Sequence, residues 1–329
     1  MKKVAFILYD SRSGSTLLAS LLNRYSGVLV TLESAFVSRI FEMPAKVLFG
    51  DSDRVLEYLS QEIQFTELCL DEVELSKRIE ALSKPYLRGD IIKAVVDVCA
   101  LHKPNAELLV IKHPPYSYLN EVIGVFPDVR FIQIIRDGRG VYHSKINAVS
   151  LSGGAMADSL VMAAWDWRWK IRCSERVERR LFTVRYEDLV SDTRGQLAGI
   201  LKWFRIGAES QVFSGEQTDY FVSIGSNQRV LHKNIAKDPS AAIAEKWKSS
   251  MTARENNLYS YIAGKELRAF GYDVPRLRPV HAAADYYYQT LRLLLRKLLN
   301  FVHLLVVAPG LAWIKLRRRL KLVLVSGYD

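Results

Sequence analysis

The chain has 329 residues and the composition of a globular protein, with 49% hydrophobic and 25% charged residues. Its net charge of +11 is uneven: residues from Arg276 onward carry ten Lys or Arg against two acidic residues, which leaves +3 for residues 1–275. The main body therefore has no broad basic surface, which argues against a nucleic-acid partner. The cysteines Cys69, Cys99 and Cys173 match no metal-ligand spacing and cannot form a closed set of disulfides, which favours a reducing compartment.

Short β-branched runs alternate with helical patterns along the chain, and this alternation predicts an α/β fold with a central, mainly parallel sheet flanked by helices. The expected strands are Val4–Tyr9, Val28–Leu32, Leu108–Lys112, Arg130–Arg136 and Leu181–Arg185. Helical segments are expected over 53–83, 89–102 and 158–180. Ligands bind at the carboxyl ends of parallel strands, so polar residues that follow these strands are candidates for a site.

A loop of small hydroxylated residues follows the first strand and leads directly into a helix. Arg12 supplies a fixed positive charge, Gly14 lets the backbone approach a ligand closely, and Ser13, Ser15 and Thr16 add hydroxyl donors. The backbone N–H groups of such a loop converge at the positive end of a helix dipole, which predicts a phosphate or sulfate site. The loop is not the P-loop of nucleotide kinases, which requires a Gly, four residues and then Gly-Lys-Ser/Thr.

A second strand–turn–helix pattern covers residues 129–144. Arg136 stands at the end of the strand and can hold a phosphate through two parallel N–H bonds. Ser144 would lie about two turns into the following helix, near enough to donate to the same group.

Two aromatic patterns are assigned structural roles. Trp165 and Trp169 share one face of the helical segment 158–180, and we expect them to pack in a core or an interface. The run Arg185–Leu189 follows the last strand, and its acidic pair suits a helix N-terminus.

The loop at residues 12–16 and the Arg136–Ser144 pair resemble the 5′-phosphosulfate loop and the 3′-phosphate motif of PAPS-dependent sulfotransferases. Phe126-Pro127-Asp128 and the following Arg-Asp-Gly-Arg run are most similar to the tyrosylprotein sulfotransferase and bacterial sulfotransferase branch. The resemblance covers about residues 4–273. It implies a P-loop-like sulfotransferase domain and 3′-phosphoadenosine 5′-phosphosulfate (PAPS) as the sulfuryl donor. The donor would bind to Arg12, Ser13, Gly14, Ser15, Thr16, Arg136 and Ser144.

Sulfuryl transfer requires cations where negative charge develops and a base for the acceptor hydroxyl. Arg12 and Lys112 are the expected cations. The base is either Glu33, in the place where tyrosylprotein sulfotransferases carry a catalytic Glu, or His113, since small-molecule sulfotransferases use a His shortly after a Lys. We favour Glu33, because His113 lies one residue closer to its lysine than in those enzymes. No metal cluster is evident, and sulfate carries less charge than phosphate, so no metal is expected.

A third donor-binding segment is expected at residues 227–248. Lys233, Trp247 and Lys248 resemble the late basic and Trp-Lys/Arg positions that close over the nucleotide in this family. Glu245 stands where the tyrosine-modifying branch has a small hydroxyl residue, which weakens the case for a protein-tyrosine acceptor.

The C-terminal part differs in composition, so we expect a sulfotransferase domain at 1–275 and a basic, apolar helical appendage at 276–329. The apolar run of the appendage is broken at Pro309-Gly310 and is followed by the basic cluster Arg317–Lys321. We therefore expect residues 286–321 to form two short helices on an anionic membrane surface, the alternative being a helical hairpin packed on protein. The expected location is cytoplasmic and peripheral on the membrane.

Together these patterns predict an enzyme that transfers a sulfuryl group from PAPS to an acceptor hydroxyl. A glycan or glycolipid is the leading acceptor, mainly because of the tail, and a peptide tyrosine is the runner-up. Two rivals remain at this point: a nucleotide-dependent kinase and a non-catalytic, membrane-associated scaffold that kept the fold.

Overall fold

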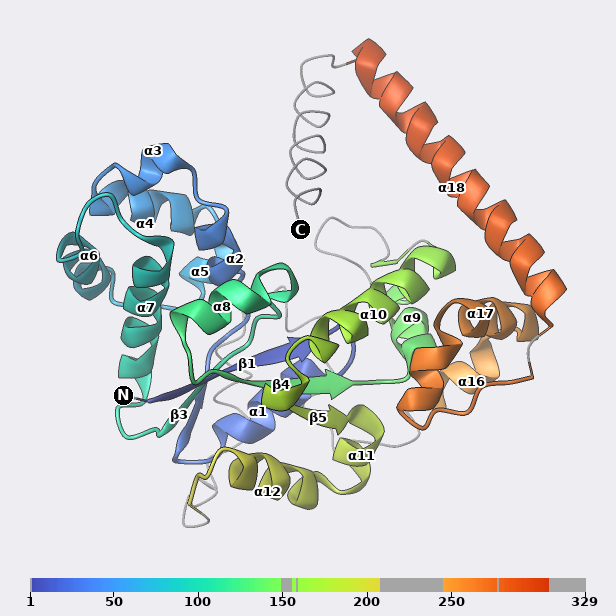
Figure 1. Ribbon diagram of the computed structural model, residues 1–329, viewed down its shortest axis with the longest axis horizontal. Coiled ribbons are helices and arrows are strands. Elements are labelled where there is room, and N and C mark those ends of the chain that lie inside the picture. Colours follow the sequence, from blue (N-terminus) through green and yellow to red (C-terminus); the bar gives the residue numbers. More distant parts are fainter. Residues whose placement is uncertain (1, 149–155, 158, 208–244, 277, 308–329) are drawn as a thin grey trace. The chain divides into compact units, whose positions relative to one another are not determined.

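The computed structural model describes residues 2–148, 156–157, 159–207, 245–276 and 278–307 (Figure 1). The chain divides into two compact units, Met1–Met251 and Thr252–Asp329. The sequence places its division later, at residue 275. The difference arises because the helix over Ala253–Ala269 groups with the C-terminal helix.

The first unit is built on a five-stranded sheet with the order β2-β3-β1-β4-β5, in which every pair of neighbours is parallel. The prediction of a parallel α/β fold is confirmed. β2 and β3 lie on one side of β1, and β4 and β5 lie on the other. The strand order therefore reverses at β1, and a ligand site is expected at the carboxyl end of this strand. The strands are β1 Lys3–Tyr9, β2 Val28–Val30, β3 Leu108–Ile111, β4 Arg130–Ile135 and β5 Leu181–Arg185.

Helices cover both faces of the sheet, because the central strand is apolar on both sides. Phe6 and Leu8 belong to one buried cluster, whereas Ala5, Ile7 and Tyr9 belong to the other. The second cluster is covered by α1 Ser15–Asn23, α11 Tyr186–Ser191 and α12 Thr193–Trp203 (Figure 1). The first is covered by α2 Phe36–Phe41, α3 Ala45–Leu48, α4 Ser52–Ser60, α5 Ile63–Thr66, α6 Glu72–Glu80, α7 Arg88–Cys99, η2 Tyr116–Tyr118, α8 Leu119–Val125 and the end of α10 Leu160–Glu175. The other elements of this unit that the structure describes are η1 Ala100–His102, α9 Gly138–Ile146, η3 Glu178–Arg180 and α16 Trp247–Ser250.

Three strands end earlier than predicted, and the difference matters for the site. β2 ends at Val30, β3 at Ile111 and β4 at Ile135. As a result Glu33, Lys112 and Arg136 all lie beyond the strand ends at the same edge of the sheet.

The tryptophans of α10 are arranged differently from the prediction. Trp167 is buried, with 3% of its surface exposed, whereas Trp165 and Trp169 are 40% and 46% exposed. Of the predicted core or interface role for Trp165 and Trp169, the core role is therefore excluded, because Trp167 is the tryptophan that α10 buries, and the interface role stays a prediction.

Within its described residues, the second unit contains the helices α17 Ala253–Ala269 and α18 Pro279–Val307. The start of α18 packs on α17: Arg254 forms a bidentate ion pair with Asp285, and the rings of Tyr261 and Tyr286 lie 6.1 Å apart. α18 is a single helix of 29 residues, and Pro309-Gly310 and the basic cluster lie outside the described residues. Among the helices that the structure describes, none is long and apolar enough to cross a membrane.

Candidate active site

The loop after β1 has the backbone of an anion site. Arg12 and Gly14 adopt positive φ angles of 72° and 96°, a conformation that turns neighbouring N–H groups toward a common point. α1 begins with Gly14 as its N-cap, without a side-chain cap bond, so the first N–H groups of the helix face the loop. The hydroxyl of Ser13 is buried and has no hydrogen-bond partner among the described residues. A buried hydroxyl without a partner suits a bound anion.

Gly14 is required here for two reasons. Its φ of 96° is unfavourable for other residues, and a Cβ atom at this position would lie 2.4 Å from Cδ2 of Tyr186. The Tyr186 ring therefore packs directly against the loop.

The second motif meets the first. Arg12 Nε donates to Ser144 Oγ (3.1 Å), and Arg136 Nη1 donates to the Arg12 carbonyl (3.3 Å). The Arg136 guanidinium also lies 4.8 Å from the centre of the Tyr186 ring. Burial, together with the neighbouring Arg136, lowers the pKa of Arg12. Two guanidinium groups this near to each other repel, and a multiply charged anion bound between them would stabilise the arrangement.

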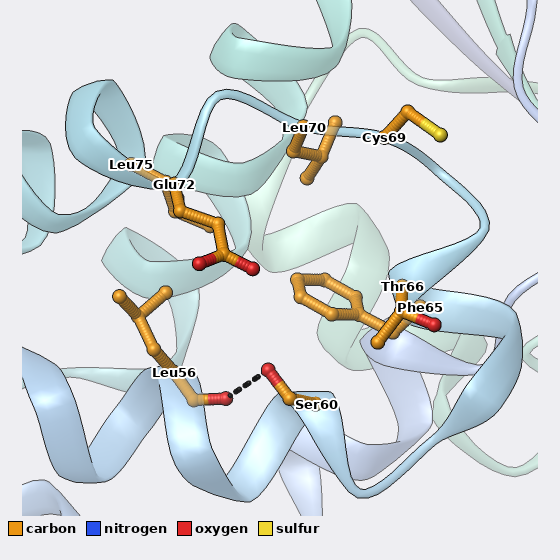
Figure 2. A pocket seen from close by; sticks show the side chains of 8 residues that line it. All are labelled: Leu56, Ser60, Phe65, Thr66, Cys69, Leu70, Glu72 and Leu75. Atoms are coloured by element: carbon orange, nitrogen blue, oxygen red, sulfur yellow. Dashed lines mark hydrogen bonds between the residues drawn. The ribbon is translucent and has the colours of Figure 1, made fainter.

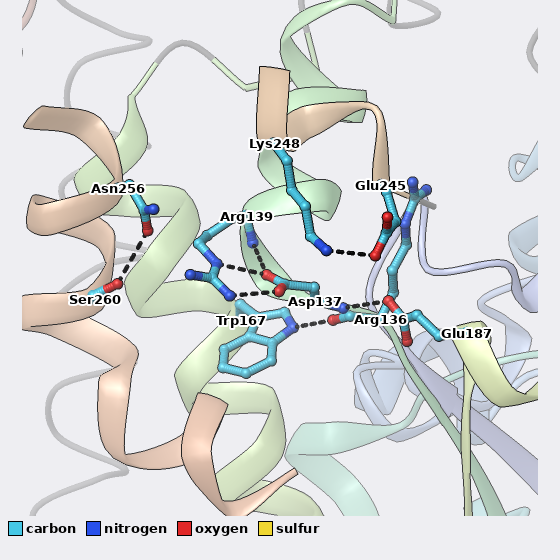
Figure 3. A network of polar contacts seen from close by, with 9 residues as sticks. All are labelled: Arg136, Asp137, Arg139, Trp167, Glu187, Glu245, Lys248, Asn256 and Ser260. Atoms are coloured by element: carbon cyan, nitrogen blue, oxygen red, sulfur yellow. Dashed lines mark hydrogen bonds and ion pairs between the residues drawn. The ribbon is translucent and has the colours of Figure 1, made fainter. Parts of the chain in front are cut away.

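The turn after β4 is held by a network of polar contacts (Figure 3). Asp137 caps α9 and receives two bonds from the Arg139 guanidinium, of 2.9 and 2.7 Å. Trp167 Nε1 donates to the Arg136 carbonyl (3.1 Å), and the Asp137 N–H donates to Glu187 (3.2 Å). Because both polar groups of the peptide that joins Arg136 to Asp137 are bonded, the carbonyl to α10 and the N–H to α11, the Arg136 side chain starts from a fixed position.

Lys112 joins the loop to the candidate base. Its side chain is only 1% exposed, and its ammonium group lies 3.0 Å from Thr16 Oγ1 and 2.9 Å from a carboxylate oxygen of Glu33. The Lys112 N–H donates to Thr31 Oγ1 (3.1 Å), which fixes the start of this segment. The Glu33 side chain is 39% exposed, so one side of the carboxylate can be reached from solvent.

His113 is held in a different environment. Its Nε2 lies 2.8 Å from the hydroxyl of Ser38 on α2, and the residue is buried. Burial lowers the pKa of His113 to about 4, against the opposing effect of Glu33. The ring is therefore neutral at pH 7 and already engaged with Ser38.

A family model described as the Sulfotransferase family matches residues 5–210, which is more than half of the chain. The chain belongs to the sulfotransferase family. It is 24% identical over 212 residues to a protein-tyrosine sulfotransferase of Drosophila melanogaster, and 25% identical over 213 residues to protein-tyrosine sulfotransferase 1 of Danio rerio. Each match covers 63% of this chain, but only 38% and 54% of the respective relatives.

A solved structure supports the same fold. The sulfotransferase domain of the Synechococcus olefin synthase is 23% identical, with a TM-score of 0.53, and the match covers 84% of this chain and 98% of that domain.

The three predicted donor contacts near the end of the sulfotransferase domain, Lys233, Trp247 and Lys248, differ in what the structure shows of them. Lys233 lies outside the described residues. Trp247, the first residue of α16, is buried against α9. The centre of its ring lies 4.3 Å from the Arg139 guanidinium, and a Cβ on Gly140 would come within 2.9 Å of the ring. Lys248 is exposed and forms an ion pair with Glu245. Trp247 thus lies near the Arg136 turn, and a contact of Lys248 with the donor stays a prediction.

Two contributions were missed at the level of sequence. Tyr186, in the run that we interpreted as structural, contacts both Gly14 and Arg136. Asp10 and Lys145, next to the two motifs, form a buried ion pair of 2.7 Å. Their positions beside Arg12 and Ser144 were the only available signal, because nothing local in the sequence pairs them.

A separate cavity of about 160 Å³ lies between α4, α5 and α6 (Figure 2). Ser60 at its edge donates back to the Leu56 carbonyl (2.8 Å), so this hydroxyl serves its own helix. No residue predicted for the site lines this cavity. Its lining residues are Leu56, Ser60, Phe65, Thr66, Cys69, Leu70, Glu72 and Leu75.

Proposed function

We propose that this protein transfers a sulfuryl group from PAPS to an acceptor hydroxyl and releases adenosine 3′,5′-bisphosphate. The observation that carries the proposal is the position of Lys112, whose ammonium contacts the anion loop through Thr16 and the exposed carboxylate of Glu33 at the same time. This arrangement brings together an anion site, a cation and a proton acceptor, which are the groups that sulfuryl transfer requires.

The donor fits the residues of the two motifs. Arg12, the Ser13 hydroxyl and the open N-terminus of α1 would hold the 5′-phosphosulfate, and Arg136 with Ser144 would hold the 3′-phosphate. Lys233, Trp247 and Lys248 remain further proposed contacts. When bound, PAPS supplies the sulfuryl group, and the protein supplies position and charge.

Each remaining step is assigned to a side chain of this chain. Glu33 accepts the proton of the acceptor hydroxyl, and Lys112 keeps the Glu33 carboxylate in place. Arg12 and Lys112 stabilise negative charge next to the loop. We prefer Glu33 to His113 as the base, because the His113 ring is buried and its Nε2 is already paired with Ser38.

For the acceptor we propose a glycan or glycolipid hydroxyl, on the basis of the tail. The exposed part of α18 supports this choice: Leu291, Leu294, Leu298 and Val302 are between 48% and 59% exposed, and the basic cluster Arg317–Lys321 follows in the sequence. We accordingly propose a cytoplasmic protein that binds peripherally to an anionic membrane.

A peptide tyrosine is the second candidate acceptor. The observation that favours it is the similarity to two proteins named protein-tyrosine sulfotransferases. Glu245, which replaces the small hydroxyl residue of that branch, argues against it.

The donor assignment is tested by calorimetry with adenosine 3′,5′-bisphosphate and AMP. The wild-type protein should prefer the bisphosphate. Arg136→Ala should weaken that binding at least tenfold, because a charge-assisted bond contributes about 1.5–3 kcal/mol, and should leave AMP binding unchanged. If the wild-type protein binds both nucleotides equally, the 3′-phosphate site is wrong.

The transfer reaction is tested with radiolabelled PAPS and three acceptor classes: glycans, glycolipids and tyrosine peptides. Label in the glycan or glycolipid fraction supports the leading acceptor, whereas label in the peptide fraction assigns the second. A cell extract, separated into fractions, is tested as a further source of acceptors. If the protein binds the nucleotide but transfers label to none of the acceptors or fractions, it is a non-catalytic binding protein.

A further inference from the structure

Four charged side chains form a network next to the loop after β1, and two of them, Asp10 and Lys145, are buried. Asp10, the residue directly after β1, is 5% exposed and receives bonds from Lys145 (2.7 and 2.8 Å) and from Lys170 (2.5 Å). Asp166, one turn before Lys170 on α10, lies 2.6 Å from Lys170 and 3.6 Å from Lys145. Two carboxylates and two ammonium groups make the network neutral as a whole.

The charges of the network depend on one another. Burial alone would lower the pKa of Lys170, but Asp10 and Asp166 outweigh this effect and raise it, so Lys170 stays charged. Burial and the nearby Asp10 raise the pKa of Tyr116 well above its usual value, so the phenol beside the network stays neutral. A buried ion pair contributes little net stability compared with apolar side chains of similar volume, but it imposes a specific geometry.

The network connects the same two segments as the site. Asp10 lies two residues before Arg12, and Lys145 directly follows Ser144. The Asp10–Lys145 pair therefore runs beside the Arg12–Ser144 hydrogen bond, and each joins the β1 loop to α9 across more than 130 residues of sequence.

The two links differ in one respect. In the proposed function Arg12 and Ser144 bind the sulfuryl donor PAPS. Their mutual hydrogen bond must therefore break when Arg12 binds the 5′-phosphosulfate and Ser144 binds the 3′-phosphate. Asp10 and Lys145 bond to each other and are not among the proposed contacts of the donor, so their link can persist.

We propose that Asp10 and Lys145, supported by Lys170 and Asp166, are positioning residues that hold the 5′ loop and the 3′-phosphate helix at the spacing of one nucleotide. This inference rests on the proposed function. The binding free energy of a ligand with two phosphates is then more favourable than the sum of the contributions of each phosphate alone, because binding at one end places the other end at its site.

The test compares four probes by calorimetry: adenosine 3′,5′-bisphosphate, AMP, adenosine 3′-monophosphate and adenosine. Each phosphate raises the affinity by a factor relative to adenosine. In the wild-type protein, the factor for the bisphosphate should exceed the product of the factors for the two monophosphates by at least tenfold, and this excess is the coupling factor. The double variant Asp10→Asn/Lys145→Met removes the link and leaves Lys170 paired with Asp166. It should bind the two monophosphates within about twofold of wild type. Its affinity for the bisphosphate should fall at least tenfold.

A conservative variant separates position from charge. Lys145→Arg keeps the ion pair and should retain the tenfold coupling, whereas Lys145→Gln should lose it. Arg78→Gln breaks the partly exposed ion pairs of Arg78 with Glu74 on α6 and Asp97 on α7, away from the predicted site residues, and serves as the matched control. If the double variant does not fold, the comparison of Lys145→Arg with Lys145→Gln decides the same question.

The outcomes are distinct. If the coupling factor is unchanged in folded Lys145→Gln and in the double variant, the network is structural only and the inference is wrong, while the donor site stands. If the wild-type protein gains nothing from the 3′-phosphate, the proposed function fails and the inference fails with it.

Discussion

Lys112 is buried and has two partners at the edge of the sheet, Thr16 Oγ1 at 3.0 Å and Glu33 at 2.9 Å. A buried ammonium group is stable only when it is paired in this way. The same two contacts place it between the anion loop and the carboxylate that we propose as base. A single side chain thus determines how these two groups lie relative to each other.

The role of Glu33 can be tested by Glu33→Gln, which keeps the shape of the side chain and removes the base. We expect turnover to fall by about 10²–10⁴-fold, with affinity for adenosine 3′,5′-bisphosphate nearly unchanged. His113→Asn serves as the comparison and should retain most of the turnover. Near-normal turnover in Glu33→Gln beside an inactive His113→Asn protein would transfer the role to His113.

His113 should make folding stability dependent on pH. Its pKa of about 4 in the folded protein lies below the ordinary value of 6.5, so between these values the unfolded chain binds more protons. Its contribution is therefore complete above pH 6.5 and is lost as the pH falls toward 4.

Denaturant unfolding at pH 7.5 and pH 5 measures this effect. His113 should account for about 2 kcal/mol of the stability lost between these two pH values. His113→Asn should show a correspondingly smaller loss. Equal pH dependence in the two proteins would contradict the burial of a neutral imidazole.

At the scale of elements, the site is formed where two strand–turn–helix units meet. β1 and α1 supply the loop, β4 and α9 supply Arg136 and Ser144, and the Tyr186 ring at the start of α11 contacts both. The loop therefore depends on close packing as well as on its own backbone.

Gly14→Ala tests this dependence. The φ of 96° and the approach of Cβ to within 2.4 Å of Tyr186 should together cost about 1–3 kcal/mol and weaken nucleotide binding. Gly124→Ala in α8 is the matched control, because its Cβ would meet nothing within 4 Å and a helical Ala stabilises by about 0.5–1 kcal/mol. Chemical denaturation of both variants decides the question, and equal stabilities would remove the argument for a constrained loop.

At the scale of the whole molecule, the second compact unit carries a series of exposed apolar side chains on one helix, α18. In the second unit, the start of α18 covers α17 through Arg254–Asp285 and Tyr261–Tyr286, whereas the later leucines of α18 are exposed. Cutting the chain at 275 would remove the cover of α17, so substitutions in the full chain are the better test of membrane binding.

Flotation with anionic liposomes makes this test. The full-length protein should float, whereas Leu294→Ser/Leu298→Ser should float less, because two exposed apolar side chains are lost. Replacement of Arg317, Arg318 and Arg319 by Gln should reduce binding further, since each basic residue contributes about 1 kcal/mol near an anionic surface. Val73→Ser on α6, also exposed, is the control. Equal flotation of all the proteins, or of none, would remove the membrane role and the main reason for a glycolipid acceptor.

The sequence by itself determined the parallel α/β fold, the five strands of the described sheet to within one or two residues at their ends, and the two strand–turn–helix motifs that we propose as phosphate sites. These follow from local chemistry: β-branched runs favour strands, and small residues with a cation after a strand form anion loops. Their strand-end positions also determined that Glu33, Lys112 and Arg136 would lie at one edge of the sheet.

Only the tertiary structure decided which of these groups touch. The Lys112–Glu33 pair, the engagement of His113 with Ser38 and the burial of Trp167 in place of Trp165 and Trp169 depend on strand order and helix rotation. The clearest case is Asp10 with Lys145, which are 135 residues apart and meet because β1 and β4 are neighbours. Side-chain pairing at such separations is set by the packing of whole elements, and no local pattern of residues encodes it.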